Sequence, residues 1–185
     1  AGTTISDKDL APMAKLKKVT YVNLAKTAIT DAALSQLAAH TGITQLHLEL
    51  TKVTDAGLAN FKDCTKLAFL EISHTQIGDA GLAHFKDCKH LVHLDLAESQ
   101  VSDKGLLQLV GYPKLYTLNV KQTRVTEAGV KQLAANLPSC KITWNDGVIK
   151  PTVNHDPDRR AVEWLQAPRE GSMAAHVFFD NKELM

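Results

Sequence analysis

Residues 43–61 read ITQLHLELTKVTDAGLANF, and residues 67–85 read LAFLEISHTQIGDAGLAHF, so the main apolar positions and one Asp recur after 24 residues. The same register runs through the rest of the chain, with acidic residues at Asp31, Asp55, Asp79, Asp103 and Glu127. A constant spacing of 24 residues between successive acidic residues is not expected by chance, so the sequence is a repeat array.

Each repeat combines a strand-like half with a helix-like half. Before Asp55, the apolar residues Ile43, Leu46, Leu48 and Val53 include the alternating Leu-x-Leu of a strand with one buried face. A single strand cannot bury that face, so the copies are expected to stack in parallel about 4.8 Å apart. A hydroxyl four residues before each acid is expected to hydrogen-bond the backbone where the chain leaves the sheet: Thr27, Thr51, Thr75, Ser99 and Thr123.

After each acid the apolar period changes from 2 to about 3.6, which predicts a helix facing the sheet. The paired positions are Leu34 and Leu37, Leu58 and Phe61, Leu82 and Phe85, Leu106 and Leu109, and Val130 and Leu133. Thr30, Thr54, Ser102 and Thr126 suit the N-cap, and the acid that follows suits the positive end of the helix. Glycine in the first turn costs helix propensity, so we interpret four such residues as sites of close packing between adjacent helices: Gly57, Gly81, Gly105 and Gly129.

Composition excludes several classes of protein. The 185 residues carry 21 Lys+Arg against 20 Asp+Glu, so there is no positive excess of the kind that nucleic-acid binding exploits. No apolar run reaches the length of a membrane span, so no membrane insertion is predicted. Three cysteines are too few for a disulfide scaffold. Cys64 and Cys88 lie one repeat apart, where a disulfide is conceivable, but we expect reduced core thiols, with Cys140 unpaired.

The array is predicted to fill residues 1–150: a half repeat at 1–15, five 24-residue repeats at 16–135 and a terminal strand at 140–149. The first strand half is missing and the chain does not start with Met, which indicates either a trimmed precursor or an array entered through a capping helix. We favour a fragment of a larger protein. Val19–Leu24 would then be an open edge strand, a place for self-association.

Residues 151–185 form a C-terminal tail with no 24-residue relation to the array. Asp156 as N-cap and Pro157 at the first position predict a short helix at 157–165, either covering the last repeat or docking another domain. The last stretch, from Ala174 to Met185, is expected either to add a strand or to remain mobile.

The Thr-Asp-Ala-Gly-Leu core, with Phe-Lys-Asp-Cys at 61–64 and 85–88, resembles leucine-rich repeat proteins abundant in planctomycetes. It is also similar to the cysteine-containing repeats of F-box proteins, although no F-box is visible. The resemblance covers residues 3–150 well and implies a solenoid that binds other molecules, often as one module of a larger signalling or scaffold protein. It implies no catalytic residue. The expected fold is a right-handed α/β horseshoe arc, with about six parallel strands on the concave side and helices on the convex side.

The residues that flank and separate the strand leucines should point to the concave face, where they differ between repeats while the frame stays constant. We therefore predict a protein-binding module, not an enzyme and without cofactors, whose partner presents a basic patch. The candidate partner-binding residues are Tyr21, Asn23, Gln45, His47, Glu49, Phe69, Glu71, Ser73, His93, Asp95, Thr117, Asn119 and Lys121. The alternative is a structural or autoregulatory segment that contacts its own larger chain through edges and tail.

A polar cluster in the middle of this face supports a more distant alternative. Glu71 and Asp95 on neighbouring strands would bring two carboxylates close together, as in paired-carboxylate hydrolysis. With His47 they could instead bind a metal. No phosphate loop, dinucleotide motif, zinc spacing or nucleophile elbow accompanies them, so neither a catalytic nor a metal residue is assigned.

Overall fold

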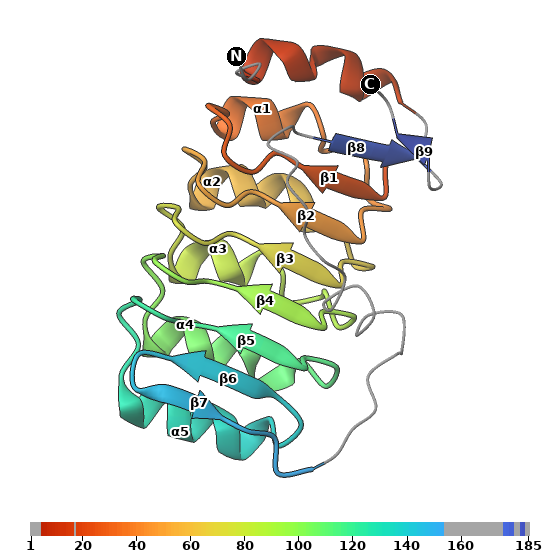
Figure 1. Ribbon diagram of the computed structural model, residues 1–185. Coiled ribbons are helices and arrows are strands. Elements are labelled where there is room, and N and C mark those ends of the chain that lie inside the picture. Colours follow the sequence, from red (N-terminus) through yellow and green to blue (C-terminus); the bar gives the residue numbers. More distant parts are fainter. Residues whose placement is uncertain (1–4, 17, 154–175, 180–181, 184–185) are drawn as a thin grey trace.

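A computed structural model of the chain describes residues 5–16, 18–153, 176–179 and 182–183. Its central feature is a row of short parallel strands, one for each repeat (Figure 1). They are β1 (Tyr21–Asn23), β2 (Gln45–His47), β3 (Phe69–Glu71), β4 (His93–Asp95), β5 (Thr117–Asn119) and β6 (Lys141–Trp144). Each residue pairs with the one 24 positions later, as Leu46 does with Leu70 and then Leu94. The sequence period is therefore the strand register, and the predicted α/β solenoid is confirmed.

The helices form a second layer behind the strands (Figure 1). They are η1 (Asp7–Lys15), α1 (Asp31–Ser35), α2 (Asp55–Leu58), η2 (Ala59–Phe61), α3 (Asp79–Ala83), α4 (Asp103–Leu107), η3 (Gln108–Gly111) and α5 (Glu127–Asn136). All but η1 and α5 are single turns, because the chain must return from Leu58 to the start of β3 at Phe69 within one short repeat. The apolar helix positions predicted to face the sheet are buried, with exposed fractions of 0 to 2%. None of the described helices could serve as a membrane span.

The N-terminus of each helix from α1 to α5 is tied to the repeat before it by an aspartate. Asp79 accepts hydrogen bonds from Ser102 N–H at 2.8 Å and Ser102 Oγ at 2.6 Å, across 23 residues. Asp31 and Asp103 bind Thr54 and Thr126 in the same way. The predicted N-cap hydroxyls are confirmed at Thr30, Thr54, Ser102 and Thr126. Each of these aspartates therefore lies at the start of its own helix and also contacts the next repeat.

These aspartates explain the helical glycines. A Cβ at Gly81 would lie 2.5 Å from Asp55 Oδ1 and 2.8 Å from Ile77 Cγ2. At Gly57, Gly105 and Gly129 the atom in the way is likewise an aspartate Oδ1 of the preceding repeat. The close packing expected at these glycines is confirmed, and the group that requires it is the carboxylate.

Two further columns shape the exit from each strand. Thr27, Thr51, Thr75 and Thr123 donate their hydroxyls to the carbonyl three residues back, at 2.6 to 2.8 Å, as predicted. The prediction is wrong at Ser99, whose buried Oγ has no hydrogen-bond partner among the described residues. Just before each of these turns, one residue per repeat adopts the left-handed backbone, with φ between 53 and 58°: Lys26, Leu50, His74, Glu98 and Gln122. The five residues are all of different types and none is glycine, and each donates its N–H to the next repeat, as Leu50 N–H does to Ser73 O.

A ladder of buried side-chain donors links the helix ends. Cys64 Sγ donates to His40 O at 3.5 Å, and Cys88 Sγ donates to Cys64 O at 3.2 Å. Tyr112, at the same place one repeat later, donates its hydroxyl to Phe85 O at 2.6 Å. The cysteines are free and buried, as expected, and Cys140 is also free.

Burial of these thiols gives a prediction for their reactivity. Desolvation raises the pKa of Cys64 to about 11 and those of Cys88 and Cys140 to about 12. At pH 8 the folded protein should therefore react with iodoacetamide at least about 100-fold more slowly than the denatured chain, because only the thiolate attacks. Unfolded thiols ionise near pH 9 while folded ones stay protonated, so stability should fall as the pH rises above 9. Alkylation followed by mass spectrometry should count three sites only in denaturant; rapid native labelling would contradict the burial.

The two ends of the array differ from the sequence predictions. The terminal strand expected at 140–149 is a hairpin, in which β7 (Gly147–Ile149) turns back antiparallel on β6. Ile149 therefore pairs with Ile142 instead of continuing the repeat. The predicted helix at 157–165 lies outside the described residues.

The N-terminal edge is also different, because Val19–Leu24 is not an open edge. β8 (His176–Phe179) pairs antiparallel with β1, placing Val177 opposite Val22, and β9 (Lys182–Glu183) pairs with β8. The sheet order in the described part of the chain is β7-β6-β5-β4-β3-β2-β1-β8-β9, with both array edges covered by antiparallel strands (Figure 1). Of the alternatives for the last stretch, an added strand is the correct one.

Candidate functional site

The predicted partner-binding residues share the strand face of the sheet, the side opposite the helices. In each strand the central residue, such as Leu46 or Leu70, is fully buried in the core, so its two neighbours project to the other side. The parallel register aligns these neighbours in rows across β1 to β6. The strands therefore gather the predicted residues on one surface.

Burial divides this surface into two parts. His47, Phe69, Glu71 and Ser73 are buried, with exposed fractions of 4 to 8%. Further along, Asp95, Thr117 and Asn119 are half-buried, and Lys121 and Lys141 are exposed. Tyr21, Asn23 and Gln45, on β1 and β2, are half-buried as well, so accessible positions lie on both sides of the buried centre.

Glu71 is the centre of the buried part. Its Oε2 lies 2.9 Å from His47 Nδ1, and its Oε1 lies 3.4 Å from His93 Nε2. His93 is held in turn by Thr117, whose Oγ1 lies 2.6 Å from His93 Nδ1. The Tyr21 ring flanks His47 with 5.2 Å between centroids. One carboxylate thus connects imidazoles from the strands on either side of it.

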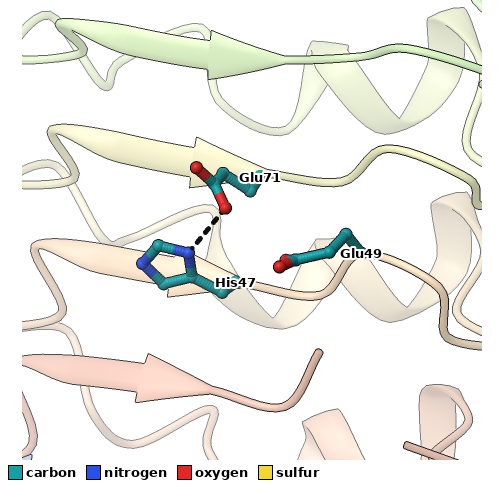
Figure 2. A group of neighbouring side chains, drawn as sticks. All are labelled: His47, Glu49 and Glu71. Carbon is teal, nitrogen blue, oxygen red and sulfur yellow. Dashed lines mark hydrogen bonds and ion pairs between the residues drawn. The ribbon is translucent and has the colours of Figure 1, made fainter. Parts of the chain in front are cut away.

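Glu49 completes the group, and Asp95 does not. Glu49 follows His47 by two residues and points toward the same space as Glu71 (Figure 2). The nitrogen and oxygen ligand atoms of His47, Glu49 and Glu71 all lie within 4.8 Å of one another. The register places Asp95 opposite Glu71, as predicted, and Asp95 Oδ1 accepts the Ala97 N–H at 3.0 Å.

A second His–Glu pair lies at the ends of the strands. His74 Nδ1 is 2.9 Å from Glu98 Oε2, and both side chains are about 40% exposed (40% and 42%). Its two residues belong to the left-handed column described above. This pair has the same contact distance as His47–Glu71 but is open to solvent.

Two solved structures resemble the chain over most of its length. An internalin (inlF) of Listeria monocytogenes matches with a TM-score of 0.60 and 24% identity, covering 76% of this chain. Internalin C2 of the same organism matches with a TM-score of 0.57 and 22% identity, covering 77% of this chain. Residues 63–85 and 87–110 match a family model described as Leucine Rich repeat. The fold is a leucine-rich-repeat solenoid.

This chain spans 38% of the first internalin structure and 66% of the second. The search of curated proteins found no match. Leucine-rich-repeat solenoids are generally used for protein–protein interaction, through the extended surface that stacked repeats create. The likeness therefore establishes the fold and leaves the partner to be found.

Proposed function

We propose that this leucine-rich-repeat solenoid is a protein-binding module that contacts its partner through the strand face. One observation carries the proposal. The inward strand positions stay aliphatic in all five 24-residue repeats, whereas the outward row His93, Thr117 and Lys141 and the row Asp95, Asn119 and Thr143 change character at each step. A constant scaffold under a varied, accessible surface is what specific recognition requires.

The charge on this face favours a partner with a basic patch. Asp95 is half-buried and Glu98 is exposed, and both project from the middle of the array. Lys121 and Lys141 lie beyond them toward β6, so the face is acidic in the middle and basic at one end. Complementary charge would orient the partner along the strand rows and speed its association.

The binding face can be tested with a photo-crosslinking amino acid at Asn119, in an extract of the source cells. A matched probe at Gln132, exposed on α5 on the helix side, serves as the control. The expected result is one specific adduct from Asn119 that is absent from Gln132. Adducts formed equally from both positions, or only from Gln132, would contradict the strand face as the binding surface.

The charge of the face can be tested separately with Asp95→Asn. Asn23 and Asn119 occupy the same row and make the same turn, with Asn23 Oδ1 accepting Ala25 N–H at 3.0 Å. Asp95→Asn should therefore keep the fold and the thermal midpoint while it weakens the Asn119 adduct. An unchanged adduct at low and high salt would exclude a basic partner patch.

The second candidate is a structural or autoregulatory segment of a larger chain. The pairing of β8 with β1 supports it, because the tail of this chain already contacts its own first strand. Under this alternative, removing residues 151–185 should alter binding more than any strand-face substitution.

We also infer a kinship with the planctomycete-type and cysteine-containing repeats, supported by the thiol ladder at Cys64 and Cys88.

A further inference from the structure

His47, Glu49 and Glu71 converge from two neighbouring strands. His47 and Glu71 stand opposite each other in the register of β2 and β3, and Glu49 lies two residues beyond His47. Figure 2 shows the Glu71 and Glu49 carboxylates on the same side of the sheet as the His47 ring. Their ligand atoms lie within 4.8 Å of one another.

These residue types and distances suit a divalent transition-metal ion. Imidazole nitrogen and carboxylate oxygen bind Zn²⁺ at about 2.0–2.2 Å, which places neighbouring ligand atoms of a tetrahedral site roughly 3.3 Å apart. His47 Nδ1 and Glu71 Oε2 are already 2.9 Å apart, so an ion between them requires only a small separation. Glu49 is half-buried, with its Oε2 atom shielded from solvent, and its ligand oxygen lies within 4.8 Å of the ligand atoms of the other two residues.

The surroundings supply an outer shell that would orient the ligands. The other oxygen of Glu71, Oε1, lies 3.4 Å from His93 Nε2, and His93 is fixed by Thr117. Outer contacts of this kind set the direction of a ligating carboxylate. Both His47 and Glu71 have exposed fractions of 4%, and burial strengthens the attraction between a cation and a carboxylate.

We propose that His47, Glu49 and Glu71 form a site for one divalent ion of the Zn²⁺ type, with His93 as a positioning residue for Glu71. The ion would join β2 to β3 in the middle of the strand face. The proposal does not rest on the protein-binding function, since the three ligands lie on β2, on β3 and two residues beyond His47, and the ion can be titrated without a partner.

The test is calorimetric titration of the full chain, freed of metal, with Zn²⁺ at neutral pH. The expected result is one ion per chain, with a Kd on the order of ten micromolar or below. Glu49→Gln should weaken binding by about 100-fold, because loss of a ligand costs at least as much as loss of an outer contact. Glu49 is half-buried whereas His47 is only 4% exposed, so this variant should fold even if His47→Gln does not.

The matched control is His74→Gln, which removes the imidazole of the exposed His74–Glu98 pair at the same 2.9 Å. It should leave the affinity and the stoichiometry unchanged. With Co²⁺ as a probe, the wild-type protein should show the visible absorption of tetrahedral cobalt, and Glu49→Gln should not. Undetectable binding at tens of micromolar, or binding lost in His74→Gln and retained in Glu49→Gln, would overturn the proposal.

Discussion

Replacing Gly105 with Ala should lower the free energy of unfolding by about 2–4 kcal/mol. In an ordinary helix the same change stabilises by up to about 1 kcal/mol. At Gly105 the change should destabilise the protein instead, because the new Cβ would occupy the space of Asp79 Oδ1 and lie 2.9 Å from Val101 Cγ1. Asp79 would have to release the N–H and hydroxyl of Ser102. Chemical denaturation of the two proteins measures the difference.

A double-mutant cycle with Asp79→Ala identifies the cause. If the carboxylate is the obstacle, the two substitutions together should cost less than the sum of their separate costs, by about 1 kcal/mol or more. Gly42→Ala is the control, because its nearest new contact is Val19 O at 3.8 Å. It should change stability by no more than about 0.5 kcal/mol. A Gly105→Ala variant as stable as the parent would show that Asp79 does not fill this space.

Removing residues 176–185 should open the N-terminal edge of the sheet and make the chain self-associate. The deletion removes three residue pairs between β8 and β1, from Tyr21–Phe178 to Asn23–His176. Such pairs contribute roughly 0.2–1 kcal/mol each, so the loss is about 1–3 kcal/mol. An uncovered β1 presents free backbone groups, and these pair readily with another chain. Light scattering during gel filtration should show a mass that grows with concentration.

A point substitution separates strand pairing from other effects of the deletion. Val177→Pro removes the amide at the centre of β8 and should reproduce the self-association. Val177→Thr keeps both the amide and a β-branched side chain, so it should remain monomeric. If the deleted and the proline variants both stay monomeric at high concentration, β8 does not protect the β1 edge.

The sequence predicted those features that each repeat builds from local or nearest-neighbour interactions. Leu46 and Leu48 alternate because one face of a strand is buried, and Thr54 precedes Asp55 because a helix needs an N-cap. The constant period then specifies the register, so His47 next to Glu71 could be predicted from their 24-residue separation. Register gives the neighbouring strand without giving the rotamer, so the sequence predicted the row of residues but not the hydrogen bonds within it. Asp95 could turn either to Glu71 or to its own backbone, and it bonds Ala97.

The sequence by itself therefore determined the repeat, the parallel strands, the inward leucines and the capped helices, since each depends on a pattern that every copy shares. Only the tertiary structure decided the contacts that the repeat pattern does not specify. It directed the Asp79 carboxylate onto the next repeat, set the contacts within the group of His47, Glu49 and Glu71, and placed β8 beside β1. The physical reason is that these contacts depend on side-chain direction or on chain segments far apart in sequence, and a period of 24 residues specifies neither.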